Sequence, residues 1–201
     1  MDASFDVPRL RTYLLWSFWA GVAFFGVYPT MNWITSLRRA PLHLYLTSEL
    51  AIPFLPQFIW PYLSMYVLFV LPLFFVPAAS MPALGKQLIA GCLISAALFL
   101  LIPAELGFRR EVPHSYAAIY AGMFSIDRPY NLVPSLHVIW STAITLACAD
   151  FARPAMRIVL LAWLCVIVAS TVLVHQHHLI DVIAALAIVF FLRRQYEVLH
   201  A

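Results

Sequence analysis

Long apolar stretches separated by shorter polar segments run through the whole chain. A transmembrane helix needs about 20 predominantly apolar residues, and six stretches approach that length. They cover approximately residues 13–32, 62–77, 87–103, 134–148, 156–174 and 179–191. No internal repeat or linker divides them. The pattern therefore predicts an all-α, integral membrane protein in which residues 1–201 form a single bundle of six transmembrane helices.

The composition favours the same conclusion. Of the 201 residues, 64% are hydrophobic and only 10% are charged, and the mean hydropathy is +0.89. A soluble domain of this size carries roughly 25% charged residues. The net charge of +3 comes from scattered basic residues, whereas a nucleic-acid-binding protein needs a clustered basic face, so that class is excluded. Cys92, Cys148 and Cys165 all lie in apolar runs, and we interpret them as small buried hydrophobic residues.

Two polar segments interrupt the apolar pattern. Residues 36–61 mix basic and aromatic side chains with four prolines, which is typical either of short amphipathic helices at the membrane interface or of an ordinary ordered loop. Residues 105–133 form the longest polar stretch, and loops of that length are usually functional or disordered. The first apolar stretch is too long for a signal-peptide core and no small-residue cleavage site follows it, so we expect a retained first span.

The distribution of basic residues predicts the orientation. With six spans, one side of the membrane receives seven basic residues: Arg9, Arg11, Lys86, Arg153, Arg157, Arg193 and Arg194. The other side receives five: Arg38, Arg39, Arg109, Arg110 and Arg128. The positive-inside rule then places both termini in the cytoplasm, most simply at a bacterial inner membrane. On this topology the segments that begin at residues 134 and 179 and the loop 105–133 all meet at the outer, periplasmic face.

Three polar residues at the starts of two apolar segments are the candidate chemistry. His137 follows Pro134, Ser135 and Leu136, and the pair His177 and Asp181 opens the last span. Ionisable residues in such surroundings are costly and mark functional sites by default. His177 and Asp181 are four residues apart, which places both side chains on one face of a helix. A carboxylate in that position can orient an imidazole and stabilise its charged form, as a nucleophile or base requires.

These residues resemble the signature of the type 2 phosphatidic acid phosphatase superfamily, which includes the sphingomyelin and inositol phosphorylceramide synthases. Arg128-Pro129 is similar to the end of the first signature stretch of that family. Pro134-Ser135-Leu136-His137 matches the second, Pro-Ser-Gly-His, apart from the leucine. Ser170-Thr171, then His177 and Asp181, match the third, apart from a threonine in place of arginine. The resemblance covers residues 109–185, and the family also has six spans.

Two basic positions of the family pattern are replaced in this chain. Ala121 stands at the first basic position, and Thr171 replaces the arginine of the third stretch. Arg109 and Arg110 lie in the same predicted outer loop, and guanidinium groups bind phosphate bidentately. These two residues are therefore the candidate substitutes, although anchoring to lipid headgroups is an equally open interpretation.

The resemblance implies a mechanism and a substrate class. His177 would attack phosphorus with Asp181 orienting it, while His137 would protonate the leaving oxygen and then act as base. Ser135 and the start of its helix would hold phosphate oxygens. Arg128 would stabilise the transition state, and Asn131 would position the loop or donate a hydrogen bond. No metal ion or other cofactor is required.

The expected function is that of a membrane phosphatase that hydrolyses a lipid phosphate or diphosphate ester, with the bilayer and the lipid as its partners. Transfer of the headgroup to a second alcohol, as in the sphingolipid synthases, is the alternative, because both reactions share the first chemical step. A non-catalytic membrane protein is the remaining alternative. The sequence does not select among phosphatidate, phosphatidylglycerol phosphate, polyprenyl diphosphate and phospholipid donors.

Overall fold

The structure is a computed structural model that describes residues 7–38 and 41–196, and it confirms the all-α class. Within these ranges the backbone forms no β-strand, only an isolated parallel bridge between Leu42 and Ala104. Three helices are long and apolar enough to cross a membrane: α1 (Val7–Ser36), α5 (Met81–Leu101) and α8 (Pro154–Leu173). The shorter helices α7 (Leu136–Phe151) and α9 (Leu179–Gln195) pack with them.

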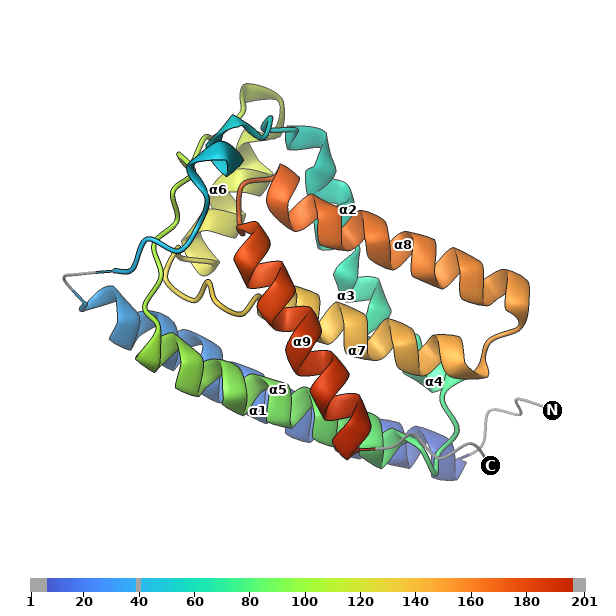
Figure 1. Cartoon of the computed structure of the whole chain (residues 1–201). Helices are drawn as coiled ribbons and strands as arrows, with labels where there is room; N and C mark the ends of the chain where they lie inside the picture. Colours follow the sequence, from blue (N-terminus) through green and yellow to red (C-terminus); the bar gives the residue numbers. More distant parts are fainter. Residues whose placement is uncertain (1–6, 39–40, 197–201) are drawn as a thin grey trace.

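Helix α7 is the centre of the bundle. It packs against α5, α8 and α9 and against the short α4 (Pro72–Phe75) (Figure 1). Of its 16 residues 12 are buried, whereas α8 buries 6 of its 20 residues. Helix α1 is the opposite case, because it lies along α5 and buries only Ala20, Asn32 and Thr35. The chain therefore wraps one central helix with elements that keep apolar outer faces.

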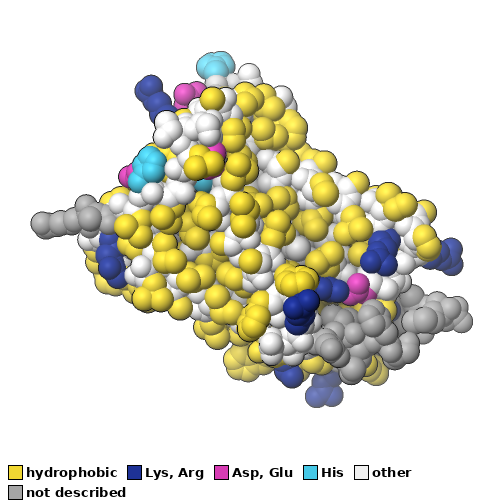
Figure 2. Space-filling model, viewed as in Figure 1, with side chains coloured by type: hydrophobic (Ala, Val, Ile, Leu, Met, Phe, Trp, Pro, Cys, Tyr) yellow, Lys and Arg dark blue, Asp and Glu magenta, His cyan; other side chains and the backbone are white. Residues whose placement is uncertain are grey.

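The outer surface is apolar. Phe18 and Phe25 of α1 and Phe190 of α9 are more than half exposed. Figure 2 shows hydrophobic side chains over the middle of the visible face, whereas charged side chains gather towards its ends. Surfaces of this kind are unfavourable in water and typical of contact with lipid chains. The helices are thus those of a membrane-associated protein.

The predicted single helix over residues 62–77 is wrong in detail. The segment is divided into α2 (Ile59–Leu63), α3 (Met65–Leu68) and α4 (Pro72–Phe75). Pro72 has no N–H to donate, and hydrogen bonds between residues three apart, such as those from the N–H groups of Val67 and Val70, replace the α pattern. The segment stays rod-like but is tighter and less regular than an α-helix.

The first polar segment contains short helices, which was one of its two expected forms, whereas the second differs from expectation. Residues 36–61 contain two short 3-10 helices, η1 (Thr47–Ala51) and η2 (Pro56–Phe58). Residues 105–133, predicted to be a long loop, contain η3 (His114–Tyr116) and α6 (Ala117–Ile126). Helix α6 was missed because ten apolar residues are too few for a span and carry no charged face. Both segments cover the same end of the bundle (Figure 1).

Five helix ends meet beneath these segments. Helices α1, α5 and α8 end there, and α7 and α9 begin there (Figure 1). The starts of α7 and α9 are joined by a hydrogen bond from the Ser135 N–H to the Asp181 carbonyl oxygen, 3.2 Å long. As a result the two histidine-bearing turns are held against each other, and the functional candidates lie at this end.

Candidate active site

The turn between α8 and α9 places His177. His175 has a positive φ of 57°, which ends α8 and reverses the chain within a few residues. The carbonyl oxygen of Thr171 accepts hydrogen bonds from the N–H groups of Gln176 (3.1 Å) and His177 (3.0 Å). Main-chain atoms therefore fix the backbone of His177 against the last turn of α8.

Asp181 orients the His177 ring. Its Oδ2 lies 3.0 Å from His177 Nδ1 and also accepts the backbone N–H of His178 at 2.9 Å. A carboxylate oxygen accepts hydrogen bonds, so the proton of the neutral imidazole is held on Nδ1 and the lone pair stays on Nε2. Both side chains are nearly inaccessible, His177 being 4% and Asp181 1% exposed. The pair has the geometry of an oriented, nucleophilic imidazole.

His137 lies beside this pair. It is the second residue of α7, and the helix is capped by Ser135, whose Oγ accepts the Val138 N–H at 3.3 Å. The ring centroids of His137 and His177 are 6.1 Å apart. The structure therefore brings together the three residues that the sequence separates by up to 44 positions. Ser135 itself is completely buried, and its position makes it a helix cap rather than an open phosphate contact.

A carboxylate that the sequence analysis missed stands behind His137. Asp127 follows α6, and its two oxygens accept hydrogen bonds from the hydroxyls of Tyr28 on α1 and Tyr62 on α2, the latter at 3.0 Å. The Tyr62 hydroxyl is also 3.4 Å from His137 Nδ1. A lone acid immediately before Arg128-Pro129 was the available signal in the sequence.

Of the three candidate arginines, Arg110 approaches the site. Its Nη2 donates to Gln176 Oε1 at 3.3 Å, and its guanidinium lies 4.6 Å from the centre of the Phe124 ring. The Nε atom is buried without a hydrogen-bond partner among the described residues. Arg109 and Arg128 are exposed. The cation next to the His177 turn is thus supplied by Arg110, which retains donors for an anionic ligand.

Asn131 supports the loop that leads into α7. It is 3% exposed, its Nδ2 donates to the carbonyl oxygen of Tyr28 at 2.9 Å, and its Oδ1 lies 3.4 Å from the Thr35 hydroxyl. These contacts tie the loop to the end of α1. Thr171 is fully buried and its hydroxyl donates to the Val168 carbonyl oxygen at 2.8 Å.

A wall of stacked rings closes the site on the side of residues 43–54. The His178 ring lies between the rings of Tyr45 and Phe108, each centroid 4.3 Å away, and the Phe108 ring stacks on His175 at 4.0 Å. His178 Nε2 accepts the Gly107 N–H at 3.1 Å, so this histidine is neutral. Burial lowers its pKa, against the opposing effect of nearby carboxylates. The wall joins three segments that are distant in sequence.

Glu49 anchors that wall to the start of α9. Its Oε2 accepts the Leu179 N–H at 2.8 Å and lies 3.3 Å from His178 Nδ1, while its Oε1 accepts the Leu46 N–H at 2.9 Å. Burial acts to raise the pKa of Glu49, but these backbone hydrogen bonds outweigh it and the pKa lies below its usual value. The helix that carries Asp181 is therefore capped by a residue from the other end of the chain.

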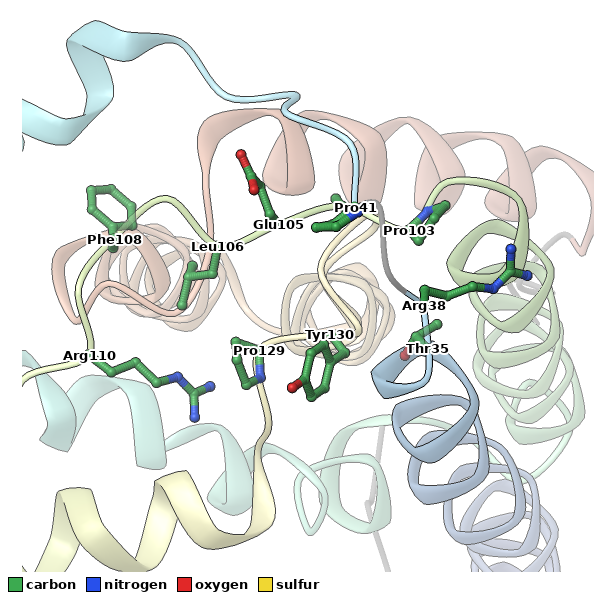
Figure 3. A pocket seen from close by; sticks show the side chains of 11 residues that line it. Thr35, Arg38, Pro41, Pro103, Glu105, Leu106, Phe108, Arg110, Pro129 and Tyr130 are labelled. Carbon is green, nitrogen blue, oxygen red and sulfur yellow. The ribbon is translucent and has the colours of Figure 1, made fainter.

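Two hollows adjoin the site. One of about 240 Å³ opens next to the guanidinium of Arg110 and has a mixed polar lining that includes Arg38, Glu105 and Tyr130 (Figure 3). In Figure 3 the Arg110 side chain extends towards Pro129 and Tyr130.

The other hollow is a cavity of about 1000 Å³ between α1, α2–α4, α5, α6 and α7. Four polar residues of its lining lie together, because hydrogen bonds or a short contact connect Tyr28, Tyr62, Asp127 and His137. The rest of its lining is mostly apolar and includes Trp16, Ala20, Phe24, Phe69, Leu84, Leu88, Trp140 and Ile144. A ligand that fills it would need a long apolar part and a polar end.

No family model matches the chain, and no curated protein or solved structure matches it either. Within the described residues, no group of three or more His, Cys, Asp or Glu side chains is arranged to hold a metal ion. What bears on function is therefore the geometry around His137, His177 and Asp181 and the two hollows beside them.

Proposed function

We propose that this chain is a six-span membrane phosphatase that hydrolyses a lipid phosphate or diphosphate ester through a phosphohistidine intermediate. The observation that carries the proposal is the His177–Asp181 pair, buried and 6.1 Å ring to ring from His137, next to an apolar cavity that His137 itself lines. An oriented imidazole, a second imidazole for proton transfer and a chain-sized apolar cavity are the three parts that such a reaction needs.

In the first step His177 Nε2 attacks phosphorus and the bond from phosphorus to the lipid oxygen breaks. His137, protonated on both nitrogens, gives its Nε2 proton to the leaving oxygen, so the lipid departs as an alcohol or monophosphate. The positive charge that develops on the His177 ring is stabilised by Asp181 through Nδ1. Arg110 neutralises part of the phosphoryl charge from the Gln176 side.

In the second step a water attacks phosphorus and the phosphorus–nitrogen bond breaks. His137, now neutral, takes the proton of that water at Nε2 and is thereby returned to its first state. Inorganic phosphate leaves, and His177 regains its Nε2 lone pair. General acid–base catalysis of this kind contributes about 10² to 10⁴ in rate.

The cavity supports a lipid as the substrate. A cavity of about 1000 Å³ is tens of times larger than the ~30 Å³ that one water molecule occupies in the liquid, so an apolar lipid chain can enter it. Each methylene transferred from water contributes about 0.8 kcal/mol, although a chain that comes from the bilayer gains far less. The cavity therefore serves to align the phosphate with the histidines more than to bind the lipid tightly.

The membrane arrangement follows from the same proposal. Helices α7 and α9 and the rod α2–α4 would complete six passes with α1, α5 and α8. The site would face the periplasm and both termini the cytoplasm, because seven of the twelve basic residues then lie on the inner side. The cavity would extend from the site towards the cytoplasmic side, because Tyr13 and Met81 also line it, and a lipid would reach the site sideways from the outer leaflet.

Headgroup transfer is the second candidate, and the hollow of about 240 Å³ beside Arg110 favours it. An acceptor with a polar head could occupy that hollow while the donor lipid fills the apolar cavity. The acceptor alcohol would then attack the phosphohistidine in place of water, with His137 taking its proton. Both candidates share the first step and the same nucleophile.

The test is phosphate release by the detergent-purified protein from a panel of lipid phosphates and diphosphates in the presence of EDTA. We expect release that His177→Ala abolishes, whereas the exposed control His43→Ala retains it. If nothing is released, the next assay offers an intact phospholipid with diacylglycerol or ceramide, and transfer that depends on His177 would select the second candidate. Activity that survives in His177→Ala, or none in either assay, would overturn the proposal.

A further inference from the structure

The surroundings of His137 Nδ1 carry an inference that rests on the proposed role of His137 in proton transfer. The Tyr62 hydroxyl has a single hydrogen, which it donates to Asp127 Oδ2 at 3.0 Å. Its oxygen is 3.4 Å from His137 Nδ1. Because that hydrogen is already committed to the carboxylate, the contact to the imidazole requires that Nδ1 carries a proton and donates it. The lone pair of neutral His137 is then on Nε2.

We propose that Tyr62 and Asp127 are positioning residues that form a hydrogen-bonded relay behind His137, holding its Nδ1 proton and leaving Nε2 as the atom that exchanges protons with the substrate. The relay runs from the Asp127 carboxylate through the Tyr62 phenol to the His137 imidazole. The Tyr62 ring packs on the His137 ring, with centroids 4.5 Å apart and planes inclined by 31°. Tyr62 is 2% exposed, so water does not compete for its hydroxyl.

The relay differs from the His177–Asp181 pair in one respect that matches the two roles. Asp181 touches its imidazole directly at 3.0 Å, which strongly stabilises the cation that forms during attack. Asp127 acts on His137 through a neutral phenol, so its influence is weaker. A nucleophile must be held in one state, whereas a proton shuttle must pass easily between two. The direct contact of Asp181 fits the role of His177 as nucleophile, and the indirect contact of Asp127 fits the role of His137 as proton shuttle.

Tyr28 keeps the relay carboxylate in place and moderates its charge. It donates its hydroxyl hydrogen to the second oxygen of Asp127, so both oxygens are engaged by phenols. Asp127 lines the same cavity as His137, where an uncovered carboxylate would repel a phosphate. The phenol hydrogens and the nearby Arg110 cation reduce that repulsion. Tyr28 makes this contact from α1, whereas Tyr62 is the one that reaches His137.

The titratable groups that face His137 come from several elements. Tyr62 comes from α2, Asp127 follows α6 and His177 follows α8, while Tyr28 of α1 and Arg110 act through Asp127. A change in the pH–rate profile can arise from any of these groups. A comparison of two matched variants isolates the contact between Tyr62 and His137.

Tyr62→Phe and Tyr28→Phe form that matched pair. Each removes one phenol hydroxyl from the same carboxylate, and only Tyr62→Phe breaks the contact to His137. We expect Tyr62→Phe to lower kcat at least about tenfold with KM changed less than about twofold, and to displace the limb of the pH–rate profile that depends on proton transfer. Tyr28→Phe should leave that limb in place, because it does not break the contact to His137, while the lost cover on Asp127 should appear in KM. Equal displacement of that limb in the two variants would overturn the relay.

A measurement without turnover separates the relay from the proposed function. In nitrogen-15 histidine spectra of the detergent-solubilised protein, assigned with His137→Gln, neutral His137 should carry its proton on Nδ1 in the wild type and in Tyr28→Phe. In Tyr62→Phe the proton should move wholly or partly to Nε2. A wild-type Nε2–H tautomer, or an Nδ1–H that persists in Tyr62→Phe, refutes the relay even if the lipid is hydrolysed. Failure of hydrolysis with the expected spectra refutes only the proposed function.

Discussion

Replacement of Asp181 by asparagine should separate orientation of the nucleophile from stability of the fold. Asp181 Oδ2 holds two donors, His177 Nδ1–H at 3.0 Å and the His178 N–H at 2.9 Å. Asp181 accepts the His178 N–H from the third position of α9, and the amide oxygen of asparagine can still accept that hydrogen bond. The side-chain amide then either presents its nitrogen to His177 Nδ1 or makes no hydrogen bond to that atom. In both cases the proton of the neutral His177 ring moves to Nε2.

The expected loss follows from that tautomer change. Exchange of an orienting carboxylate for an amide lowers kcat by about 10⁴ in a hydrolase with comparable geometry, which corresponds to ~5.4 kcal/mol at 1.36 kcal/mol per tenfold. The unfolding temperature should stay within a few degrees of the wild type. Asp181→Ala, in contrast, leaves two buried donors unsatisfied, each costing about 1–3 kcal/mol, and should destabilise the protein as well.

The assay is single-turnover phosphorylation with a radiolabelled lipid phosphate, quenched in alkali because phosphohistidine is labile in acid. Asp181→Asn should form the labelled protein at least about a thousandfold more slowly than the wild type. The matched control is Asp150→Asn, which removes the carboxylate paired with Arg193 at 2.7 Å, on the far end of α7, and should label normally. Labelling of Asp181→Asn at more than a tenth of the wild-type rate would refute the orienting role of Asp181.

Three further outcomes test other parts of the structure. Arg110→Ala should raise KM for a lipid phosphate about tenfold in steady-state kinetics, because its guanidinium adjoins the His177 turn. The variant of its exposed neighbour, Arg109→Ala, should leave KM within about twofold. Equal effects of the two variants would contradict the placement of Arg110 at the site. Gly85→Ala should cost about 1–3 kcal/mol, since a Cβ there would clash with the Trp16 indole that lines the cavity, and should reduce kcat/KM for long-chain substrates more than for short-chain ones. Burial lowers the pKa of His178 below 6.5, so the stability that its neutral form contributes is lost as the pH falls from 6.5 through its folded-state pKa. The thermal unfolding temperature should therefore fall between pH 7.5 and 5. His178→Gln should make that pH dependence smaller.

The helical class and the ends of most apolar helices could be predicted because lipid-facing segments must satisfy their backbone internally. Helices α8 and α9 lie where the apolar runs placed them, with ends displaced by up to four residues, whereas α5 begins six residues before the predicted start at residue 87. The rod α2–α4 was harder, since its apolar character is uniform and only Pro61 and Pro72 show that the α pattern breaks. Helix α6 lacked any periodic signal that separates it from a loop.

The site divides in the same way. His177 and Asp181 are four residues apart and their contact is local. The predicted reason is wrong, because His177 lies in the turn before α9 and the two side chains do not share a helix face. His137 could be placed beside them only through the order of the spans. Asp127 accepts hydrogen bonds from Tyr28 and Tyr62, which are 99 and 65 positions away in the sequence. The spacing of these residues does not predict those contacts. Contacts that depend on the packing of distant helices are set by tertiary structure, which a single sequence does not display.

The turn that carries His177 has a consequence for how such a site can diverge. His177 is fixed by the carbonyl oxygen of Thr171, an atom that every amino acid possesses, while the threonine side chain turns inward to α8. The side chain at position 171 can therefore be exchanged without displacing the backbone of His177. Under the proposed function, separate parts of the chain then place the attacking nitrogen and the phosphate-binding cation, so the cation can come from another loop, as Arg110 does.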